Sequence, residues 1–242
     1  MRALKVVDPL LTGDDVARLQ AALGIRKTGV YDEKTAAAVK AWKWRVGFRA
    51  NQVNGTIAAR GQRWLFGEKP LPPDFQERAE QRKQDAASAA RIDGFISGGT
   101  WRIRGDPRYA ERSPLDGFGD VFVRVGRKHG VDPLFLVAIA THENRLGTFK
   151  AIQAKHNTFG LGPGRTYPTW EANIEAAAKN LARPDGFYVG KNTIRTVGLT
   201  WAPLGAGNDP ADLNRHWVGS VTRFYAQLGG RNDMDAVVKT RP

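Results

Sequence analysis

The most apolar segment of the sequence is Asp132-Pro-Leu-Phe-Leu-Val-Ala-Ile-Ala-Thr-His-Glu-Asn-Arg-Leu-Gly147. Asp132 is a favoured helix N-cap, and Pro133 fits the first helical position, where its missing N–H costs nothing. The helix should stop at Gly147, because glycine readily adopts the left-handed conformation that ends helices. Since the stretch is apolar on nearly every side, it predicts a central, buried helix of a mainly α-helical domain.

One carboxylate interrupts this apolar helix. Glu143 follows Leu136, Ile139 and Ala140 by seven, four and three residues, so all four share one helix face. Burial and the negative end of the helix dipole both disfavour a charged carboxylate and should raise the pKa of Glu143. A carboxyl group that stays protonated near neutral pH can act as a general acid. Taken alone, the pattern also fits a structural ion pair between Glu143 and a cation such as Arg145 or an arginine further along the chain.

Further toward the N-terminus, the first 70 residues predict three short helices. Thr12-Gly-Asp-Asp15 approximates a capping box at the start of the first, and Asp32 can cap the second, over 33–44. The third is expected over 56–66, ending at Gly67.

A break follows the third helix. Pro70-Leu-Pro-Pro73 cannot continue a helix, and residues 74–92 are charged and poor in apolar residues, as in a solvated helical connector. Another helix is expected over 118–129. We therefore predict a mainly α protein with domains at 1–70 and 101–242 and a charged linker at 71–100.

Composition excludes several classes of protein. The chain has 242 residues and no cysteine, so a disulfide scaffold, a cysteine-ligated zinc site and a cysteine nucleophile are ruled out. The longest apolar run is far below the roughly 20 residues of a membrane span. The first residues also lack an apolar core of the length that a secretory signal needs. We expect neither a transmembrane segment nor a signal peptide.

The net charge is +13, which favours polyanionic partners such as nucleic acid, anionic lipid or anionic cell-wall polymers. Residues 1–70 hold 13 basic and 6 acidic residues, and residues 101–242 hold 20 and 13, so each block carries +7. The alternative is diffuse, solvated charge without a dedicated anion-binding face.

Three motifs in the first block point to a known family. Gly13-Asp-Asp-Val-Ala-Arg-Leu-Gln20, Gly29-Val-Tyr-Asp-Glu-Lys-Thr-Ala-Ala-Ala-Val39 and Val53-Asn-Gly-Thr56 together resemble the three-helix peptidoglycan-binding domain. The resemblance covers about 60 residues and implies a module that binds cell-wall glycan and peptide without chemistry of its own. Trp42-Lys-Trp44 departs from the family, which usually has an aromatic residue followed by Gln.

A second resemblance spans roughly residues 117–230. Glu143-Asn-Arg-Leu-Gly147 and Asn157-Thr-Phe-Gly160, followed by motifs at 167–174, 188–193, 201–210 and 217–225, are similar to the glucosaminidase branch of the lysozyme superfamily. By that likeness Glu143 is the general acid that protonates a glycosidic oxygen. The residues expected to shape, line or support the cleft are Asn157, Phe159, Tyr167, Tyr188, Trp201 and Tyr225.

Two departures bear on the mechanism. Relatives often carry a hairpin with a second acid after the N-x-F-G turn, but here only Gly162-Pro-Gly-Arg-Thr166 precedes Tyr167. Glu171 is the possible second acid, although its position suits the first turn of a helix. Trp201 stands where relatives often have tyrosine, and an indole cannot accept a hydrogen bond as a phenol oxygen can. A single acid would act with the substrate's own acetamido group, or as acid and then base, as in a lytic transglycosylase.

Other chemistries have weaker support. His142-Glu143 resembles the start of a zinc-protease H-E-x-x-H motif, but position 146 is leucine. A zinc amidase built from scattered ligands and a basic nucleic-acid-binding protein remain alternatives. We expect no metal, no cofactor and no dedicated nucleic-acid partner.

Together the two resemblances imply a bacteriolytic peptidoglycan hydrolase, an N-acetylglucosaminidase or muramidase (lysozyme) that cleaves the N-acetylglucosamine/N-acetylmuramic acid backbone. A wall-binding domain, a linker, a lysozyme-like glycosidase domain and basic charge resemble a phage endolysin. Such an antimicrobial enzyme accumulates in the host bacterial cytoplasm before lysis and then acts on peptidoglycan and the anionic envelope surface. We expect a monomer.

Overall fold

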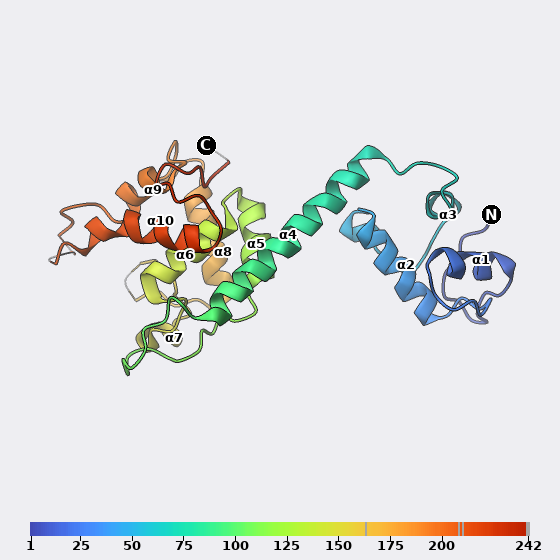
Figure 1. The fold of residues 1–242 in the computed structure, drawn as a ribbon, viewed down its shortest axis with the longest axis horizontal. Coiled ribbons are helices and arrows are strands. Elements are labelled where there is room, and N and C mark those ends of the chain that lie inside the picture. Colours follow the sequence, from blue (N-terminus) through green and yellow to red (C-terminus); the bar gives the residue numbers. More distant parts are fainter. Residues whose placement is uncertain (163, 208, 210, 241–242) are drawn as a thin grey trace. The chain divides into compact units, whose positions relative to one another are not determined.

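The structure is a computed structural model that describes residues 1–162, 164–207, 209 and 211–240. Helices account for 51% of the described residues, and β-structure among them is limited to isolated bridges (Figure 1). The predicted mainly α class is therefore confirmed. In the part of the chain that the structure describes, no helix is both long and apolar enough to cross a membrane.

Packing divides the chain into two compact units, Met1–Gln84 and Asp85–Pro242. The division between the two units lies within the helix Pro73–Gly98. The domain boundaries at residues 70 and 100 remain a prediction from the sequence. Unit 1 contains α1 (Asp14–Ala22), α2 (Glu33–Arg45), the 3-10 helix η1 (Ala50–Gln52), α3 (Ala59–Leu65) and the first part of α4 (Pro73–Gly98). Unit 2 contains the rest of α4, α5 (Gly119–His129), α6 (Pro133–Asn144), α7 (Lys150–Gln153), α8 (Trp170–Ala182), α9 (Ile194–Trp201), the 3-10 helix η2 (Leu213–His216) and α10 (Trp217–Gln227).

The helix starts of unit 1 follow local hydrogen bonding. Asp32 caps α2 as expected, because its side chain accepts a hydrogen bond of 2.8 Å from the backbone N–H of Thr35. The capping box expected at Thr12 and Asp15 does not form, since the Asp15 carboxylate pairs with Arg2 at 2.7 Å instead.

The third helix is shorter than predicted. It starts at Ala59 rather than at residue 56, because the preceding Ile57 pairs with Leu4 through two backbone hydrogen bonds of 2.8 and 3.0 Å. The backbone of Ile57 is therefore held in an isolated β-bridge and cannot enter the helix.

Helix α4 differs from the solvated connector that its composition suggests. Phe75, near its start, is buried against the rings of Phe48 and Trp64, with centroids 4.7 and 5.3 Å away. Ile92 and Ile96, near its end, are fully buried in the core of unit 2. Three apolar residues scattered in a charged stretch thus attach each half of the helix to its own unit.

Helix α6 lies at the centre of unit 2, as predicted. It is buried from Phe135 through Thr141, and α5, α8 and α10 pack against it (Figure 1). The Asp132 side chain caps it by accepting a 2.8 Å hydrogen bond from the N–H of Leu134. The helix ends at Asn144, slightly before the expected end, because Arg145 already adopts the left-handed conformation, with φ 49°. Glu143 therefore lies in the last turn of a buried helix.

Candidate active site

Glu143 lines a cleft of about 680 Å³ in unit 2. The walls come from the end of α6, the turn at residues 159–162, Tyr188, the end of α9 with the two residues after it, and residues of η2 and the start of α10. A separate cavity of about 780 Å³ is lined by residues 102–107 and 109–111 and by Lys150, and none of the side chains named above lines it. Chemistry at Glu143 therefore belongs to the first cleft.

Two tryptophans hold the carboxyl group of Glu143. The indole N–H groups of Trp201 and Trp217 each donate a hydrogen bond of 2.8 Å to the same oxygen, Oε1. Burial raises the pKa of Glu143 above its ordinary value, and the two indole hydrogen bonds oppose that rise because they stabilise the anion. No cation pairs with this carboxyl group among the described residues. The structure thus gives Glu143 no ion pair with Arg145.

This arrangement assigns the proton of the neutral acid to the other oxygen. An indole N–H can only donate, so Oε1 must accept in both protonation states of Glu143. The acidic proton therefore resides on Oε2. A Cβ built on Gly160 would lie 3.5 Å from Oε2, and Gly160 has φ +64° and lines the cleft. Glycine at this turn keeps the approach to Oε2 open.

Two amide side chains hold the turn at residues 159–162 in place through hydrogen bonds. Asn157 donates to the carbonyls of Leu161 and Arg165 at 3.2 Å, and its Oδ1 accepts from the N–H of Leu161 at 3.0 Å. Asn173 of α8 donates to the same Oδ1 at 3.2 Å. Asn157 thus shapes the turn without lining the cleft, whereas Phe159 both belongs to the turn and lines the cleft.

Aromatic side chains pack against one another beside Glu143. The ring of Trp201 lies 6.1 Å from Tyr188, 6.2 Å from Trp217 and 6.5 Å from Phe159, measured between centroids. Burial, together with the charge of Glu143, raises the pKa of Tyr188 to about 12, so its hydroxyl stays protonated near neutral pH. Of the predicted residues, the structure brings Glu143, Phe159, Tyr188 and Trp201 together at the cleft.

Three predicted residues lie elsewhere. Tyr225 donates a 2.7 Å hydrogen bond to Asp132 at the opposite end of α6, and Tyr167 is buried outside the cleft lining. Glu171 lies in the first turn of α8 and pairs with Arg124 at 2.9 Å. Among the described residues that line the cleft, Glu143 is the only carboxylate.

The cleft lining also includes three residues that the sequence motifs did not predict there: Trp217, His142 and His216. The motif that begins at Trp217 was visible, but nothing in it indicated an indole directed at a carboxylate 74 residues away. Burial and nearby cations lower the pKa of His142 to about 4, so this residue is neutral near pH 7. In the described part of the chain, no cluster of three or more His, Asp or Glu side chains has a metal-binding arrangement.

Comparison with known protein families found no family model that matches the chain, and comparison with curated proteins found no match either.

Proposed function

We propose that this protein is a glycoside hydrolase acting on peptidoglycan, with Glu143 as its general acid. The observation that carries the proposal is the carboxyl group of Glu143 itself: its pKa is raised, both indole donors bind Oε1, and Oε2 is left to hold a proton at the cleft. The order of motifs from Glu143 to Tyr225, which resembles the glucosaminidase branch of the lysozyme superfamily, supplies the substrate class.

In the proposed step, Oε2 gives its proton to the glycosidic oxygen, and the bond between that oxygen and C1 of the sugar breaks, with its electron pair leaving on the oxygen. Glu143 becomes a carboxylate as positive charge develops at C1. Both indole N–H groups then donate to an anion, and hydrogen bonds to charged groups are about twice as strong as neutral ones. The two indole hydrogen bonds to Glu143 are therefore stronger after proton transfer than before it.

The positive charge at C1 needs a second group, and the described cleft lining offers no second carboxylate. The substrate's own acetamido oxygen can attack C1, after which water completes hydrolysis. Alternatively, Glu143 takes back a proton from the sugar's C6 hydroxyl, which closes an anhydro ring and makes the enzyme a lytic transglycosylase. The single carboxylate favours these two outcomes over a mechanism with a paired nucleophile.

For unit 1 we propose a role in binding the cell wall. A groove of about 690 Å³ is lined by Arg60, Arg63, Trp64 and Lys69 together with the prolines at 70, 72 and 73. The three cations have no carboxylate partner among the described residues, and the lining contains no acidic side chain. A groove with this charge suits the anionic groups of the wall. With this binding role the chain would be an endolysin that acts from the host cytoplasm, as a monomer.

The reaction is tested by the products. Purified peptidoglycan is digested with the full chain, and the fragments are analysed by reducing-end labelling and mass spectrometry. New muramic acid ends indicate a muramidase, new glucosamine ends a glucosaminidase, and anhydromuramic ends a transglycosylase. Release of peptides from intact glycan would contradict the proposal and favour an amidase.

The binding role is tested with charge reversals in the full chain. The double variant Arg60→Glu and Arg63→Glu should pellet less with purified walls, whereas Lys27→Glu with Lys40→Glu, which reverses two exposed cations elsewhere in unit 1, should pellet normally. Preference for DNA over walls at physiological salt, with a steep salt dependence, would contradict the wall-binding role.

A further inference from the structure

The C-terminal segment at residues 234–240, which we call the C-terminal strap, joins two distant parts of unit 2. On one side, the N–H of Arg195 donates to the carbonyl of Met234, and the N–H of Val238 donates to the carbonyl of Asn192, both at 2.8 Å. On the other side, the carbonyl of Val238 accepts from Asp132 at 2.8 Å, and the N–H of Thr240 donates to Gly130 at 3.0 Å. The strap thus links the start of α9 to the start of α6.

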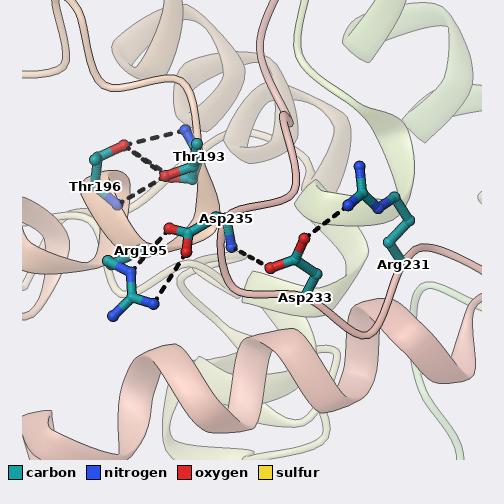
Figure 2. Close-up of polar contacts among 6 residues, drawn as sticks. All are labelled: Thr193, Arg195, Thr196, Arg231, Asp233 and Asp235. Atoms are coloured by element: carbon teal, nitrogen blue, oxygen red, sulfur yellow. Dashed lines mark hydrogen bonds and ion pairs between the residues drawn. The ribbon is translucent and has the colours of Figure 1, made fainter.

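A charged contact anchors α9 to the strap. Arg195 donates two hydrogen bonds to the Asp235 carboxylate, at 2.8 and 3.0 Å (Figure 2). Next to it, Thr193 caps α9, and its hydroxyl and backbone bond with Thr196 (Figure 2). The last residue of this short helix is Trp201, which binds Glu143. Asp235 therefore holds one end of a helix whose other end touches the catalytic carboxyl group.

Lys239 is the unusual member of the strap. It is only 2% exposed, and its Nζ donates a hydrogen bond of 2.8 Å to the backbone carbonyl of Tyr188. Burial lowers the pKa of Lys239, because removing an ammonium group from water is costly. An apolar side chain of similar length would avoid that cost, so stability alone does not account for a lysine here. Its hydrogen bond instead fixes the backbone of a residue that lines the cleft.

We propose that Lys239 and Asp235 are positioning residues, through which the C-terminal strap holds Tyr188 and Trp201 against Glu143. The path runs from Lys239 to the Tyr188 backbone, from the Tyr188 ring to the Trp201 indole, and from the indole N–H to Oε1 of Glu143. Trp217 reaches the same oxygen from α10 and lies outside this path. The effect of this positioning on catalysis rests on the proposed function. The positioning of Tyr188 and Trp201 itself does not.

The test uses Lys239→Met in the full chain, which keeps the length of the side chain and removes the donor. The indole N–H signals of the seven tryptophans are recorded by NMR and assigned by single Trp→Phe variants. The Trp201 signal should move upfield as its hydrogen bond to Glu143 weakens, and the Trp217 signal, which belongs to a helix outside the path, should move less. The melting temperature should be unchanged or higher. On peptidoglycan, kcat should fall about tenfold, since small misplacements of catalytic groups cost up to about a hundredfold.

Two further variants complete the design. Arg231→Gln breaks the exposed pair with Asp233 just before the strap and should leave the signals and kcat unchanged (Figure 2). Asp235→Asn should reproduce the shift of the Trp201 signal. This variant tests the positioning of Trp201 if Lys239→Met does not fold.

Unchanged Trp201 signals in every folded variant would overturn the proposal, and so would equal shifts of Trp201 and Trp217. A loss of kcat that follows the folded fraction would also overturn it. If the Trp201 signal moves but wild-type protein cleaves no glycan, the positioning stands and the proposed function fails.

Discussion

The indole N–H of Trp217 donates a 2.8 Å hydrogen bond to Oε1 of Glu143, across 74 residues of sequence. Trp201 donates to the same atom from α9. Two donors that converge on one oxygen leave the other oxygen to carry the proton. The pair therefore does two things: it orients the acid before proton transfer, and it stabilises the carboxylate afterwards.

Replacing Trp217 with phenylalanine should lower kcat/KM by about 10- to 100-fold, because a hydrogen bond to a charged group contributes roughly 1.5–3 kcal/mol. The lost bond is one that lowers the pKa of Glu143, so the alkaline limb of the pH–rate profile should move to higher pH. Both effects are measured from rates on peptidoglycan over a pH series.

Trp101→Phe is the matched control for this prediction. The Trp101 indole N–H donates to the carbonyl of Phe95 at 3.0 Å, away from the cleft. This variant should be somewhat less stable and keep the wild-type pH profile. An alkaline limb that stays in place in Trp217→Phe, or that moves equally in both variants, would contradict the assigned role of Trp217.

Gly160→Ala should reduce activity more than its effect on stability explains. The left-handed φ of +64° costs a non-glycine residue about 1–2 kcal/mol, and the added methyl group lies 3.5 Å from Oε2 of Glu143. Gly164→Ala has the same kind of backbone strain at φ +74°, but its methyl group meets nothing within 4 Å. Thermal unfolding and initial rates of the two variants separate strain from obstruction, and equal losses of activity would rule out the obstruction.

His142 should make the protein less stable in mild acid. Its pKa is about 4 in the folded chain and 6.5 unfolded, so the unfolded state binds a proton first as the pH falls. The contribution of the neutral His142 to the free energy of unfolding is fully present above pH 6.5. It is lost as the pH falls toward 4, by up to about 3 kcal/mol. In His142→Gln the free energy of unfolding, measured with urea between pH 7 and 4, should depend less on pH. Parallel curves for the two proteins would contradict this expectation.

The sequence predicted those features that depend on neighbours along the chain. The central helix, its cap at Asp132 and the cap at Asp32 follow from local patterns, and all are present. Burial of Glu143 followed from its place on an apolar face, and the direction of its pKa shift agrees.

Features that depend on tertiary contacts could not be predicted in the same way. The second indole at Glu143 comes from a helix distant in sequence, and Phe75, Ile92 and Ile96 are too isolated to form a pattern. Asp15 was expected to cap a helix, but the fold brings Arg2 close enough to take its carboxylate. Tyr225 carries a hydroxyl directed at Asp132, which its motif did not indicate.

The role of Glu143 as general acid is tested by the variant Glu143→Gln. Glutamine keeps an oxygen that can accept from both indoles and removes the transferable proton. A carboxyl group with a raised pKa stabilises the fold below its ordinary value of 4.5 and loses that stabilisation as the pH rises through the folded value. The variant should therefore melt at the same or a higher temperature near pH 7.

The measurement is release of glycan fragments from peptidoglycan by Glu143→Gln, set beside its melting temperature and the control Glu171→Gln, which removes a carboxylate paired with Arg124 outside the cleft. We expect a loss of about 10²–10⁴-fold or more for Glu143→Gln, in fully folded protein that still binds walls, and a modest effect for the control. If a folded Glu143→Gln protein keeps wild-type activity, Glu143 is not the general acid.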